Sequence, residues 1–577
     1  MSSKFLDLFK LWIEKAASEK DLVDELKSIE KNSSEIKDRF YRDLGFGTAG
    51  MRGIIGAGTN RINVFVVGKI TQAFCEYLKT TKKKCSVAIS YDSRNKSLDF
   101  LKCSAKVFAA NGIDVYIFKD IAPVPLLSFV VRYCGFDAGV MITASHNPFQ
   151  YNGYKVFGSD GCQLLEGPAK RIFNISKKLD IFSDVKKISF SLALKEEKIK
   201  YIKKEVIEEY YKNVISCFIN KDCLKDKDLN VLYTPLNGAG KRFVFDVSKK
   251  VGIKNFSFVE EQKEPDMNFT TCKTPNPETK EALSLGLKYC KENKPDIFVA
   301  TDPDGDRVGV AVPLNKNKKR YLVLSGNEIG ILMFYYICNQ KKALNMMPKK
   351  PVAIKTIVSS NLFEDIAKEH KVKVINVTTG FKNIGEQITK LEKKGRADDF
   401  IFGFEESNGY LAGNYIRDKD GVCSAVLLCE IAAFYKKQNK TVAEVLKEIY
   451  KKYGYYLNRV ESFVFKGQKG TKDMNKIMQG LRDAKLNNIA GVEVLKIKDY
   501  LNGTIYDFNT KKEQNFRCKK ENILVYSLFN KAGLIVRPSG TEPKIKLYFS
   551  VFEEDKTKAT ELLNKLTKNF NIKKYLK

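Results

Sequence analysis

Histidine is almost absent from this chain of 577 residues, in which only His146 and His370 occur. A metal site made of several histidines is therefore excluded, and a Ser-His-Asp triad could use only those two positions. Long apolar runs are missing as well, since the longest, from Ile329 to Cys338, covers about half of a bilayer. The first residues lead into an amphipathic stretch instead of an apolar signal core, so we expect a cytoplasmic protein.

Cysteine pairing is also unsupported, although the chain has 13 cysteines. Their number is odd and no C-x-x-C pair occurs, which excludes a disulfide scaffold as a description of the whole chain. Most lie in apolar surroundings, a pattern typical of reduced thiols that act as small hydrophobic side chains. Examples are Cys75, Cys134, Cys338 and Cys429.

Arginine is scarce relative to lysine, with 16 Arg against 84 Lys, although the net charge is +32. Such a charge can indicate a polyanionic partner such as nucleic acid or an anionic membrane. Proteins that bind nucleic acid favour arginine and concentrate charge on one face, whereas these lysines are scattered along the chain. The scatter favours a lysine-rich composition, so we expect neither nucleic acid nor membrane as a partner.

What the chain does contain is an alternation of short β-rich runs, Gly/Pro loops and helical patterns. Its length allows about three to five domains. The alternation predicts α/β units, with ligand loops at the carboxyl ends of strands. Buried strands are expected at residues 87–91, 115–118, 139–143, 231–234, 297–301, 352–357 and 372–377, and helices at 97–111 and 328–340.

The two ends of the chain differ from this alternation. Near the N-terminus, apolar residues at 5, 9, 12, 13 and 16 share one face of a predicted helix. The C-terminal part has Lys/Asn-rich connections and a strand-like run at 546–552 before a final helix, which predicts a separate α+β domain. Polar stretches near 190–205, 313–320 and 453–470 are candidate boundaries.

The first of four loops with chemical interest, residues 138–148, follows a buried strand and presents Ser145 in a turn of small residues. Pro148 prevents simple continuation of the strand. A serine hydroxyl in such a place is a candidate nucleophile or phosphoryl carrier. The alternative is a plain turn whose polar side chains bond to the backbone.

In the second loop, Asp302, Asp304 and Asp306 alternate after another buried strand. Three carboxylates in this arrangement can converge on one hard cation, and oxygen ligands favour Mg²⁺, Ca²⁺ or Mn²⁺ over Zn²⁺. An EF-hand is excluded, because its required Gly and Glu would be Arg307 and Pro313. Buried unpaired aspartates are costly without a cation, so we predict metal binding.

The third loop, residues 402–410, contains Glu405 and Ser407 between glycines. Carboxylate and hydroxyl oxygens in a Gly-bounded loop suit recognition of sugar hydroxyls. The alternative is a solvated acidic loop.

The fourth loop, residues 534–544, places Arg537, Ser539 and Thr541 around Gly540. Arginine, two hydroxyls and a glycine-freed backbone are typical of an anion-binding nest, for which phosphate is the natural ligand. The alternative is a turn bracketed by prolines.

Together these loops indicate phosphoryl transfer on a phosphorylated sugar. Neither a Walker loop nor a kinase signature occurs, which argues against ATP as the donor. Arg52, in a Gly-rich stretch, and Lys155, shortly after Ser145, add positive charge. A sugar held by its own phosphate at one end and facing a serine at the other suggests a mutase.

At this point the chain resembles a known family, the α-D-phosphohexomutase superfamily, over nearly its full length. The motifs T-A-S-H-N-P, D-P-D-G-D-R, F-E-E-S and R-P-S-G-T-E-P occur in the order typical of that family. The spellings G-T-A-G-M-R-G, Y-T-P-L-N-G-A-G, T-G-F-K and F-E-E-S-N-G-Y look like its type-2 phosphoglucomutase and phosphopentomutase branch.

The resemblance implies an α/β fold of four domains around a central cleft. Three similar mixed α/β domains would span residues 1–204, 205–315 and 316–455, followed by a smaller α+β domain at 456–577. It also implies an enzyme that interconverts glucose 1-phosphate and glucose 6-phosphate through a phosphoserine, with one Mg²⁺ per chain and glucose 1,6-bisphosphate as intermediate and activator.

The resemblance further implies roles for individual residues. The catalytic group would be Ser145, His146, Lys155, Lys382 and Arg52. The metal ligands would be Asp302, Asp304, Asp306 and the phosphorylated Ser145. The substrate-binding group would be Arg307, Thr379, Gly380, Glu405, Ser407, Arg537, Ser539, Gly540 and Thr541.

The preferred sugar stays open, since Asn237 and Tyr410 stand where many relatives carry histidine. Alternatives within the branch are a phosphopentomutase, which acts on ribose or deoxyribose 1-phosphate, and a glucose-1,6-bisphosphate synthase. A basic polyanion-binding protein without catalysis is the non-enzyme alternative. His146 could orient the phosphate or be structural, His370 is expected to be exposed, and the oligomeric state is open.

Overall fold

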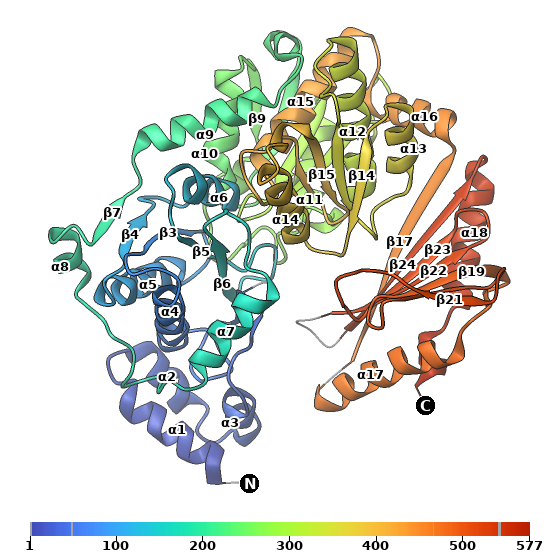
Figure 1. The fold of residues 1–577 in the computed structure, drawn as a ribbon. Helices are drawn as coiled ribbons and strands as arrows, with labels where there is room; N and C mark the ends of the chain where they lie inside the picture. Colours follow the sequence, from blue (N-terminus) through green and yellow to red (C-terminus); the bar gives the residue numbers. More distant parts are fainter. Residues whose placement is uncertain (1–2, 48–49, 466, 540–543, 577) are drawn as a thin grey trace. The chain divides into compact units, whose positions relative to one another are not determined.

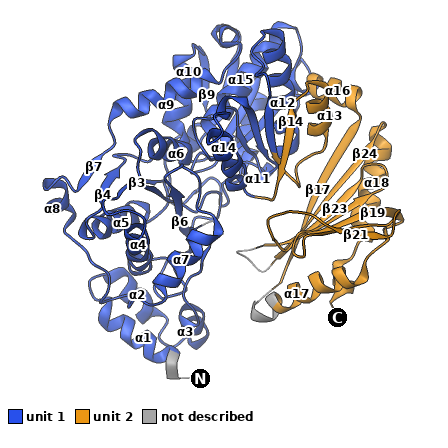
Figure 2. Cartoon of the chain, in the orientation of Figure 1, with its two compact units in different colours: residues 1–354, 380–443 blue, residues 355–379, 444–577 orange. Residues whose placement is uncertain are grey.

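The structure, a computed structural model, describes residues 3–47, 50–465, 467–539 and 544–576. The chain divides into two compact units, shown in Figure 2. The first unit comprises residues 1–354 and 380–443, and the second comprises residues 355–379 and 444–577. Within the described residues, no helix combines the length and the apolar character needed to cross a membrane.

The helices follow the chain as labelled in Figure 1. The α-helices are α1 (Ser3–Lys15), α2 (Lys20–Ser28), α3 (Ser33–Phe40), α4 (Val64–Lys79), α5 (Ser97–Ala110), α6 (Val124–Tyr133), α7 (Glu166–Ser176), α8 (Phe190–Lys195), α9 (Lys204–Ser216), α10 (Gly240–Lys250), α11 (Lys280–Asn293), α12 (Gly326–Ala343), α13 (Leu362–Glu369), α14 (Phe381–Glu392), α15 (Gly421–Lys437), α16 (Val442–Tyr453), α17 (Gly467–Ala484) and α18 (Lys556–Asn569). Short 3₁₀ helices are η1 (Lys221–Lys225), η2 (Glu260–Gln262), η3 (Ala397–Asp399) and η4 (Ile572–Tyr575).

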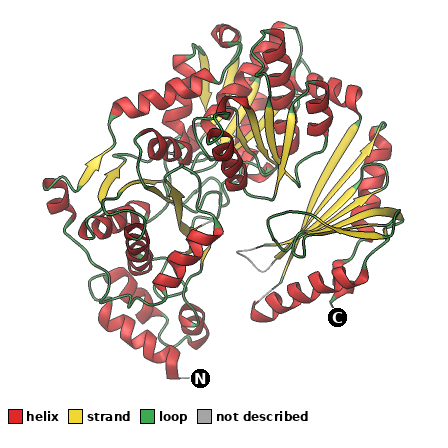
Figure 3. Cartoon of the chain, viewed as in Figure 1, coloured by secondary structure: helices red, strands yellow, loops and turns green. Residues whose placement is uncertain are grey.

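The strands are distributed over both units, with the second unit richer in them (Figure 3). They are β1 (Phe46–Gly47), β2 (Gly50–Ile54), β3 (Ser86–Tyr91), β4 (Asp114–Ile117), β5 (Ala138–Ile142), β6 (Tyr151–Gly158), β7 (Ile199–Tyr201), β8 (Asn230–Thr234), β9 (Asn255–Phe258), β10 (Ile297–Thr301), β11 (Val308–Pro313), β12 (Tyr321–Val323), β13 (Val352–Thr356), β14 (Lys373–Val377), β15 (Phe400–Glu405), β16 (Gly409–Leu411), β17 (Tyr455–Val464), β18 (Asn488–Ile489), β19 (Val492–Asp499), β20 (Thr504–Asp507), β21 (Lys512–Asn515), β22 (Leu524–Leu528), β23 (Gly533–Pro538) and β24 (Lys544–Glu553).

The first sheet of the first unit has seven strands in the order β1-β2-β6-β5-β3-β4-β7. The strands β5, β3, β4 and β7 are parallel, β6 is antiparallel to β5, and β2 is antiparallel to β6. All five residues of β5 are buried, as expected for a central strand covered on both faces. Helices α5 and α6 both pack against β3.

The second sheet of the first unit repeats this plan with five strands in the order β12-β11-β10-β8-β9. Strands β9, β8 and β10 are parallel, and β11 and β12 are antiparallel. The segment β15–β16 adds a third hairpin, in which Glu405 pairs with Gly409. In each case a buried strand is followed by a loop and then by an antiparallel return strand.

The second unit contains an antiparallel sheet, in which β17-β24-β23-β22-β19-β20-β21 are neighbours. The longest pairing joins β17 to β24 over ten residues each. Helix α18 packs on both of these strands. The core of the second unit is a continuous apolar cluster that includes Ile477, Leu534 and Leu566. This unit therefore buries a core of its own.

Side chains define the starts of several helices. Asn63 accepts hydrogen bonds from the N–H groups of Phe65 and Val66 at the start of α4. Ser325 and Glu328 form a capping box at the start of α12. These bonds satisfy N–H groups that have no partner within the helix.

The predicted α/β class, with mixed sheets and a β-rich C-terminal part, is confirmed. The seven strands predicted from the sequence all occur, with ends shifted by at most one residue. The domain boundaries at 204, 315 and 455 stay predictions. The return strand β6 and the short N-terminal strands β1 and β2 were not predicted, because their glycines and polar residues hide the strand pattern.

Two predictions about single residues are wrong. His370 is buried, with 8% of its surface exposed, because it ends α13 with its backbone N–H bonded to Ile366. Cys134 is exposed, because it lies one residue beyond the C-terminus of α6. The charged sequence neighbours of His370 suggested exposure, and the apolar neighbours of Cys134 suggested burial. In both cases the sequence neighbours did not indicate the surroundings in the folded protein.

The contact between α11 and β10 gives a test of packing beneath the second sheet. A Cβ atom at Gly286 would lie 2.0 Å from Phe298 Cζ, so Gly286→Ala must displace a buried aromatic ring. We expect the clash to outweigh the helix propensity of alanine and to destabilise the protein by about 1–3 kcal/mol. Thermal unfolding would measure this as a lower midpoint.

The matched control is Gly45→Ala, since a Cβ at Gly45 has no heavy atom within 4 Å. Its midpoint should stay close to that of the unchanged protein. Equal midpoints for the two variants would contradict the close packing of Gly286 on Phe298.

Candidate active site

The predicted functional loops of the first unit lie between a strand and its antiparallel return strand. Residues 143–150 join β5 to β6, residues 302–307 join β10 to β11, and residues 406–408 join β15 to β16. The backbone N–H of Val308 bonds to the carbonyl of Asn408, and Thr143 lies 3.3 Å from Asp304. The serine, aspartate and sugar loops of the sequence analysis are thus linked to one another.

Ser145 lies at the centre of this group, with 5% of its surface exposed. Its backbone adopts φ = +51°, a left-handed conformation that is strained for a residue with a side chain. The N–H of Ser145 donates to Thr143 Oγ1 at 2.7 Å. The hydroxyl donates to Asp302 Oδ2, also at 2.7 Å, which confirms that the first two loops meet.

Arg94 holds the serine loop in place, a role that the sequence analysis did not identify. Its guanidinium donates to the backbone carbonyls of Ser145, Asn147, Pro148 and Tyr151. It also forms an ion pair with Asp92 and lies over the ring of Phe269. The available signal was its position just after the predicted strand at 87–91. Because one side chain fixes four carbonyls, Arg94 stabilises the strained turn at Ser145.

The three predicted metal ligands are fully buried and lie together. One oxygen from each of Asp302, Asp304 and Asp306 falls within 4.8 Å of the others. Asp302 Oδ1 accepts hydrogen bonds from the backbone N–H groups of Asp306 and Arg307. Burial and the neighbouring carboxylates raise the pKa of Asp302 well above its usual value. Three buried like charges therefore raise the free energy of this arrangement.

Two carboxylate oxygens of the cluster are available to bind a cation. Asp304 Oδ1 and Asp306 Oδ1 are buried and accept no hydrogen bond from any described residue. Buried carboxylate oxygens rarely lack a hydrogen-bond partner unless they bind an ion. An all-oxygen set of this kind suits a hard divalent metal. The residues present therefore fit the predicted metal site.

Successive backbone carbonyls hold the metal loop to separate parts of the chain. The carbonyl of Pro303 accepts from Ala239, that of Asp304 from Val124, and that of Gly305 from Gly421. These donors stand at the starts of α10, α6 and α15, respectively. The loop conformation is thus fixed from three directions, independently of any ion.

Lys155 and Lys419 supply positive charge beside the aspartates. Lys155 Nζ lies 2.7 Å from Asp304 Oδ2 and 3.3 Å from Asp306 Oδ2. Lys419 Nζ lies 3.1 Å from Asp306 Oδ2 and 3.2 Å from Asp418 Oδ1. Lys155 was predicted, whereas Lys419 was missed because it stands in an ordinary charged run at 417–420. That run precedes α15, whose first turn is capped by Asp420.

Both lysines are held in the charged form. Burial acts to lower the pKa of Lys155, but Asp304 and Asp306 outweigh it and raise the pKa to about 12. Burial is likewise outweighed by Asp306 and Asp418 at Lys419, whose pKa is raised above its usual value. A depressed pKa, which a lysine needs to act as a base, is found at neither position.

His146 and Arg52 flank the serine. His146 Nδ1 lies 3.2 Å from Ser145 Oγ. Burial, assisted by Arg307 and Arg52, lowers the pKa of His146 well below 6.5, so its ring is neutral at pH 7. Arg52, on β2, donates to Asn147 Oδ1 at 2.8 Å. The structure therefore brings both predicted residues to the serine loop.

The predicted sugar loop reaches the same region. Glu405 is buried and accepts a hydrogen bond from the N–H of Gly380 at 3.0 Å. Its charge contributes to raising the pKa of Lys419. Lys382 follows in the first turn of α14, where its carbonyl contacts Cys162. Ser407 is half-buried in the turn.

The other predicted sugar-site residues have different outcomes. Arg307 forms an ion pair with Glu278, which partly neutralises the charge of its guanidinium. Thr379, Arg537 and Ser539 belong to the second unit, where Arg537 lies on β23. Gly540 and Thr541 fall outside the described residues. The anion-binding role of this last loop stays a prediction.

Two residues noted for specificity prove to be structural. The Asn237 side chain donates to the carbonyls of Glu261 and Glu264 and accepts from Thr271. The Tyr410 hydroxyl donates to the carbonyl of Gly326. Both side chains are buried and hydrogen-bonded within the fold.

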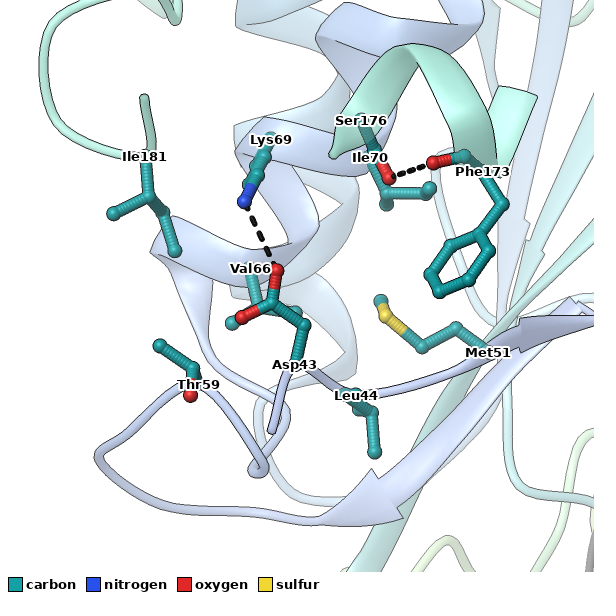
Figure 4. Close-up of a pocket in the computed structure, with 10 residues that line it drawn as sticks. All are labelled: Asp43, Leu44, Met51, Thr59, Val66, Lys69, Ile70, Phe173, Ser176 and Ile181. Atoms are coloured by element: carbon teal, nitrogen blue, oxygen red, sulfur yellow. Dashed lines mark hydrogen bonds and ion pairs between the residues drawn. The ribbon is translucent and has the colours of Figure 1, made fainter. Parts of the chain in front are cut away.

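A small pocket in the first unit has no part in this chemistry. Figure 4 shows its lining, which includes Met51, Phe173 and the Lys69–Asp43 ion pair. Its volume is about 30 Å³, enough for roughly one water molecule. It is thus too small for a sugar phosphate.

Comparison with known families agrees with this geometry. The α/β/α domains I, II and III of the phosphoglucomutase/phosphomannomutase family match residues 43–181, 208–315 and 325–453. These matches include the serine, metal and sugar loops, respectively. Together they cover more than half of the chain.

Individual relatives extend the likeness to nearly the whole chain. A phosphoglucomutase of Staphylococcus haemolyticus is 36% identical over 518 residues, which are 89% of this chain and 91% of that one. A phosphoglucomutase of Staphylococcus saprophyticus is 36% identical over 555 residues, 96% of this chain and 98% of that one.

The fold has solved counterparts as well. The crystal structure of parafusin, a phosphoglucomutase from Paramecium, has a TM-score of 0.68 and 17% sequence identity, and the match covers 92% of this chain and 96% of that one. The chain belongs to the α-D-phosphohexomutase superfamily.

The aspartate cluster generates a direct test of metal binding. Asp304→Asn removes one charge and one of the unsatisfied oxygens, so we expect the affinity for Mg²⁺ to fall by roughly 100-fold. Titration calorimetry with Mg²⁺ measures this without any substrate.

Asp222→Asn is the matched control, because Asp222 is exposed and pairs with Lys225 on the surface. Its Mg²⁺ affinity should equal that of the unchanged protein. If Asp304→Asn also binds Mg²⁺ normally, the aspartates are neutralised by Lys155 and Lys419 and do not form a metal site.

Proposed function

We propose that this member of the superfamily interconverts glucose 1-phosphate and glucose 6-phosphate through a phosphorylated Ser145. The observation that carries the proposal is the hydrogen bond from Ser145 Oγ to Asp302, inside a cluster with two unsatisfied carboxylate oxygens. A serine beside three aspartates has no evident structural use. It suits a phosphoryl carrier that works with a divalent cation.

Ser145 would exchange one phosphoryl group with the sugar. In the first half-reaction the bond from Ser145 Oγ to phosphorus breaks, and a bond from the free sugar hydroxyl to phosphorus forms. The product of this step is glucose 1,6-bisphosphate. In the second, the other phosphate of that intermediate returns to Ser145. The left-handed turn and Arg94 keep the oxygen in a fixed position for both steps.

Asp302, Asp304 and Asp306 would hold Mg²⁺, one ion per chain. When bound, the ion supplies positive charge that offsets the charge of the phosphoryl group during transfer. The ammonium groups of Lys155 and Lys419 provide further positive charge at the same carboxylates.

Proton movement is assigned to His146. Its neutral ring lies 3.2 Å from Ser145 Oγ, within reach of the oxygen that gains or loses a proton. Lys155 and Lys419 are the weaker candidates, because their raised pKa values keep them protonated at pH 7. We assign them to charge stabilisation.

Glu405 and Ser407 would bind hydroxyl groups of the sugar. Carboxylate and hydroxyl contacts are not restricted to one ring atom, so they can accept both orientations of the bisphosphate. The same property would allow a shorter sugar, which keeps phosphopentomutase activity as an alternative. Lys382 and Arg307 are assigned to the phosphate and ring oxygens of the substrate.

Ser145→Ala tests the covalent step. Turnover of glucose 1-phosphate should disappear, because no other residue can carry the phosphoryl group in this position. Incubation of the unchanged protein with glucose 1,6-bisphosphate should add one phosphate to the chain, located at Ser145 by peptide mass spectrometry.

Ser183→Ala is the control, since Ser183 is an exposed serine of the same unit. It should retain both turnover and labelling. Residual turnover of Ser145→Ala above a few per cent would rule out the phosphoserine mechanism.

A substrate panel tests the sugar loop. The purified protein should act on glucose 1-phosphate and on ribose 1-phosphate. Glu405→Gln should lower kcat/KM for both by about 10- to 100-fold, the cost of losing a hydrogen bond to a charged group.

Glu208→Gln serves as control, because Glu208 is exposed and pairs with Lys250 on the surface. It should leave both rates unchanged. Turnover of mannose phosphates alone, or an effect of Glu405→Gln on one sugar only, would contradict the assignment of this loop.

A further inference from the structure

A second cavity of the first unit gathers lysines far from the aspartates. Its volume is about 180 Å³, and its lining includes Lys316, Lys318, Lys436 and Lys440 together with Asp296. We call it the lysine pocket. Lys316, Lys318 and Lys436 face the single carboxylate of Asp296, so these four side chains carry a net charge of about +2.

Asp296 organises the pocket without neutralising it. The carboxylate has 9% of its surface exposed, and both of its oxygens are occupied. Oδ1 lies 2.6 Å from Lys318 Nζ, whereas Oδ2 lies 2.8 Å from Lys436 Nζ and accepts from the N–H of Asn230. Two ammonium groups from different segments are therefore held side by side by one buried anion.

The remaining charge is not explained by the fold. Lysines near the C-terminus of α15, such as Lys436, are favoured there by the helix dipole. Lys318 is paired with Asp296, but Lys316 has no such reason, because it belongs to the loop between β11 and β12. Lys316 forms no ion pair with any residue that the structure describes. Like charges that gather around a cavity repel one another unless an anion joins them.

The pocket is separate from the candidate active site. Asp296 precedes β10 and Asp302 follows it, so the five residues of this strand lie between them. The six residue steps from Asp296 to Asp302, at about 3.3 Å each, place the two carboxylates roughly 20 Å apart along the strand. The small anion that one site binds cannot reach the other at the same time.

We propose that the lysine pocket binds the phosphate group of a small anion, as a site distinct from the catalytic one. Phosphate oxygens accept several hydrogen bonds, and lysine ammonium groups suit them as mobile point charges. The ligand is either inorganic phosphate or the phosphate ester of a small metabolite. The volume accommodates a phosphate together with part of an attached group.

The experiment measures protection of individual lysines. The full chain is acetylated briefly with and without inorganic phosphate, and separately with glucose 6-phosphate, at constant ionic strength set by chloride. Acetylation at each lysine is then measured by peptide mass spectrometry. Phosphate should protect Lys316 and Lys318 about tenfold relative to Lys319, their exposed neighbour outside the pocket. Stronger protection by glucose 6-phosphate than by phosphate identifies an ester as the ligand, and the reverse identifies the free ion.

Variants make the result specific. Lys316→Gln removes a charge without breaking an ion pair and should lower the protection of Lys318 about tenfold, whereas Lys319→Gln should not change it. Both variants should keep the mutase rate, because neither residue belongs to the active site. Equal acetylation of Lys316 and Lys318 with phosphate, glucose 6-phosphate and chloride would overturn the proposal, as would undiminished protection in Lys316→Gln.

Discussion

The repulsion among three buried aspartates is the constraint on which the rest of the active site depends. Asp302, Asp304 and Asp306 cannot remain together in a dry interior without compensation. The compensation comes from ammonium groups on two separate elements and from backbone N–H groups, and two carboxylate oxygens accept no hydrogen bond from any described residue. Lys155, Lys419 and the turn at Ser145 all take their positions relative to this cluster.

One structural plan supplies the loops that meet at this cluster. In each case a buried strand ends, a short loop carries the polar side chains, and an antiparallel strand returns beside the first. A hairpin fixes both ends of its loop, so the loop cannot drift when ligands change. Repetition of this plan allows one polypeptide to bring a serine, three aspartates and the buried Glu405 together while each stands on a rigid support.

The sequence predicted those parts of the site that are continuous in the chain. Asp302, Asp304 and Asp306 were identifiable because they alternate after a buried strand. Ser145 was identifiable because it follows a buried strand in a turn where Pro148 prevents simple continuation of that strand. Arg94 and Lys419 were missed because their partners are distant: Arg94 bonds to residues more than 50 positions away, and Lys419 to Asp306. Asn237 and Tyr410 were considered as specificity residues because the sequence does not show their hydrogen-bond partners, which are distant in the chain.

The hydrogen bonds that hold residues 302–307 to Val124, Ala239 and Gly421 form in a fixed order relative to translation. A growing polypeptide can form the first two attachments once the loop itself has left the ribosome, but the third must wait for Gly421, which is synthesised 116 residues after Gly305. At about 5–20 residues per second, this interval lasts roughly 6–23 s. During it, the aspartates lack both Lys419 and the start of α15. The catalytic centre is therefore completed late in translation, and a chain truncated before residue 421 would contain every predicted metal ligand without the surroundings that hold them together.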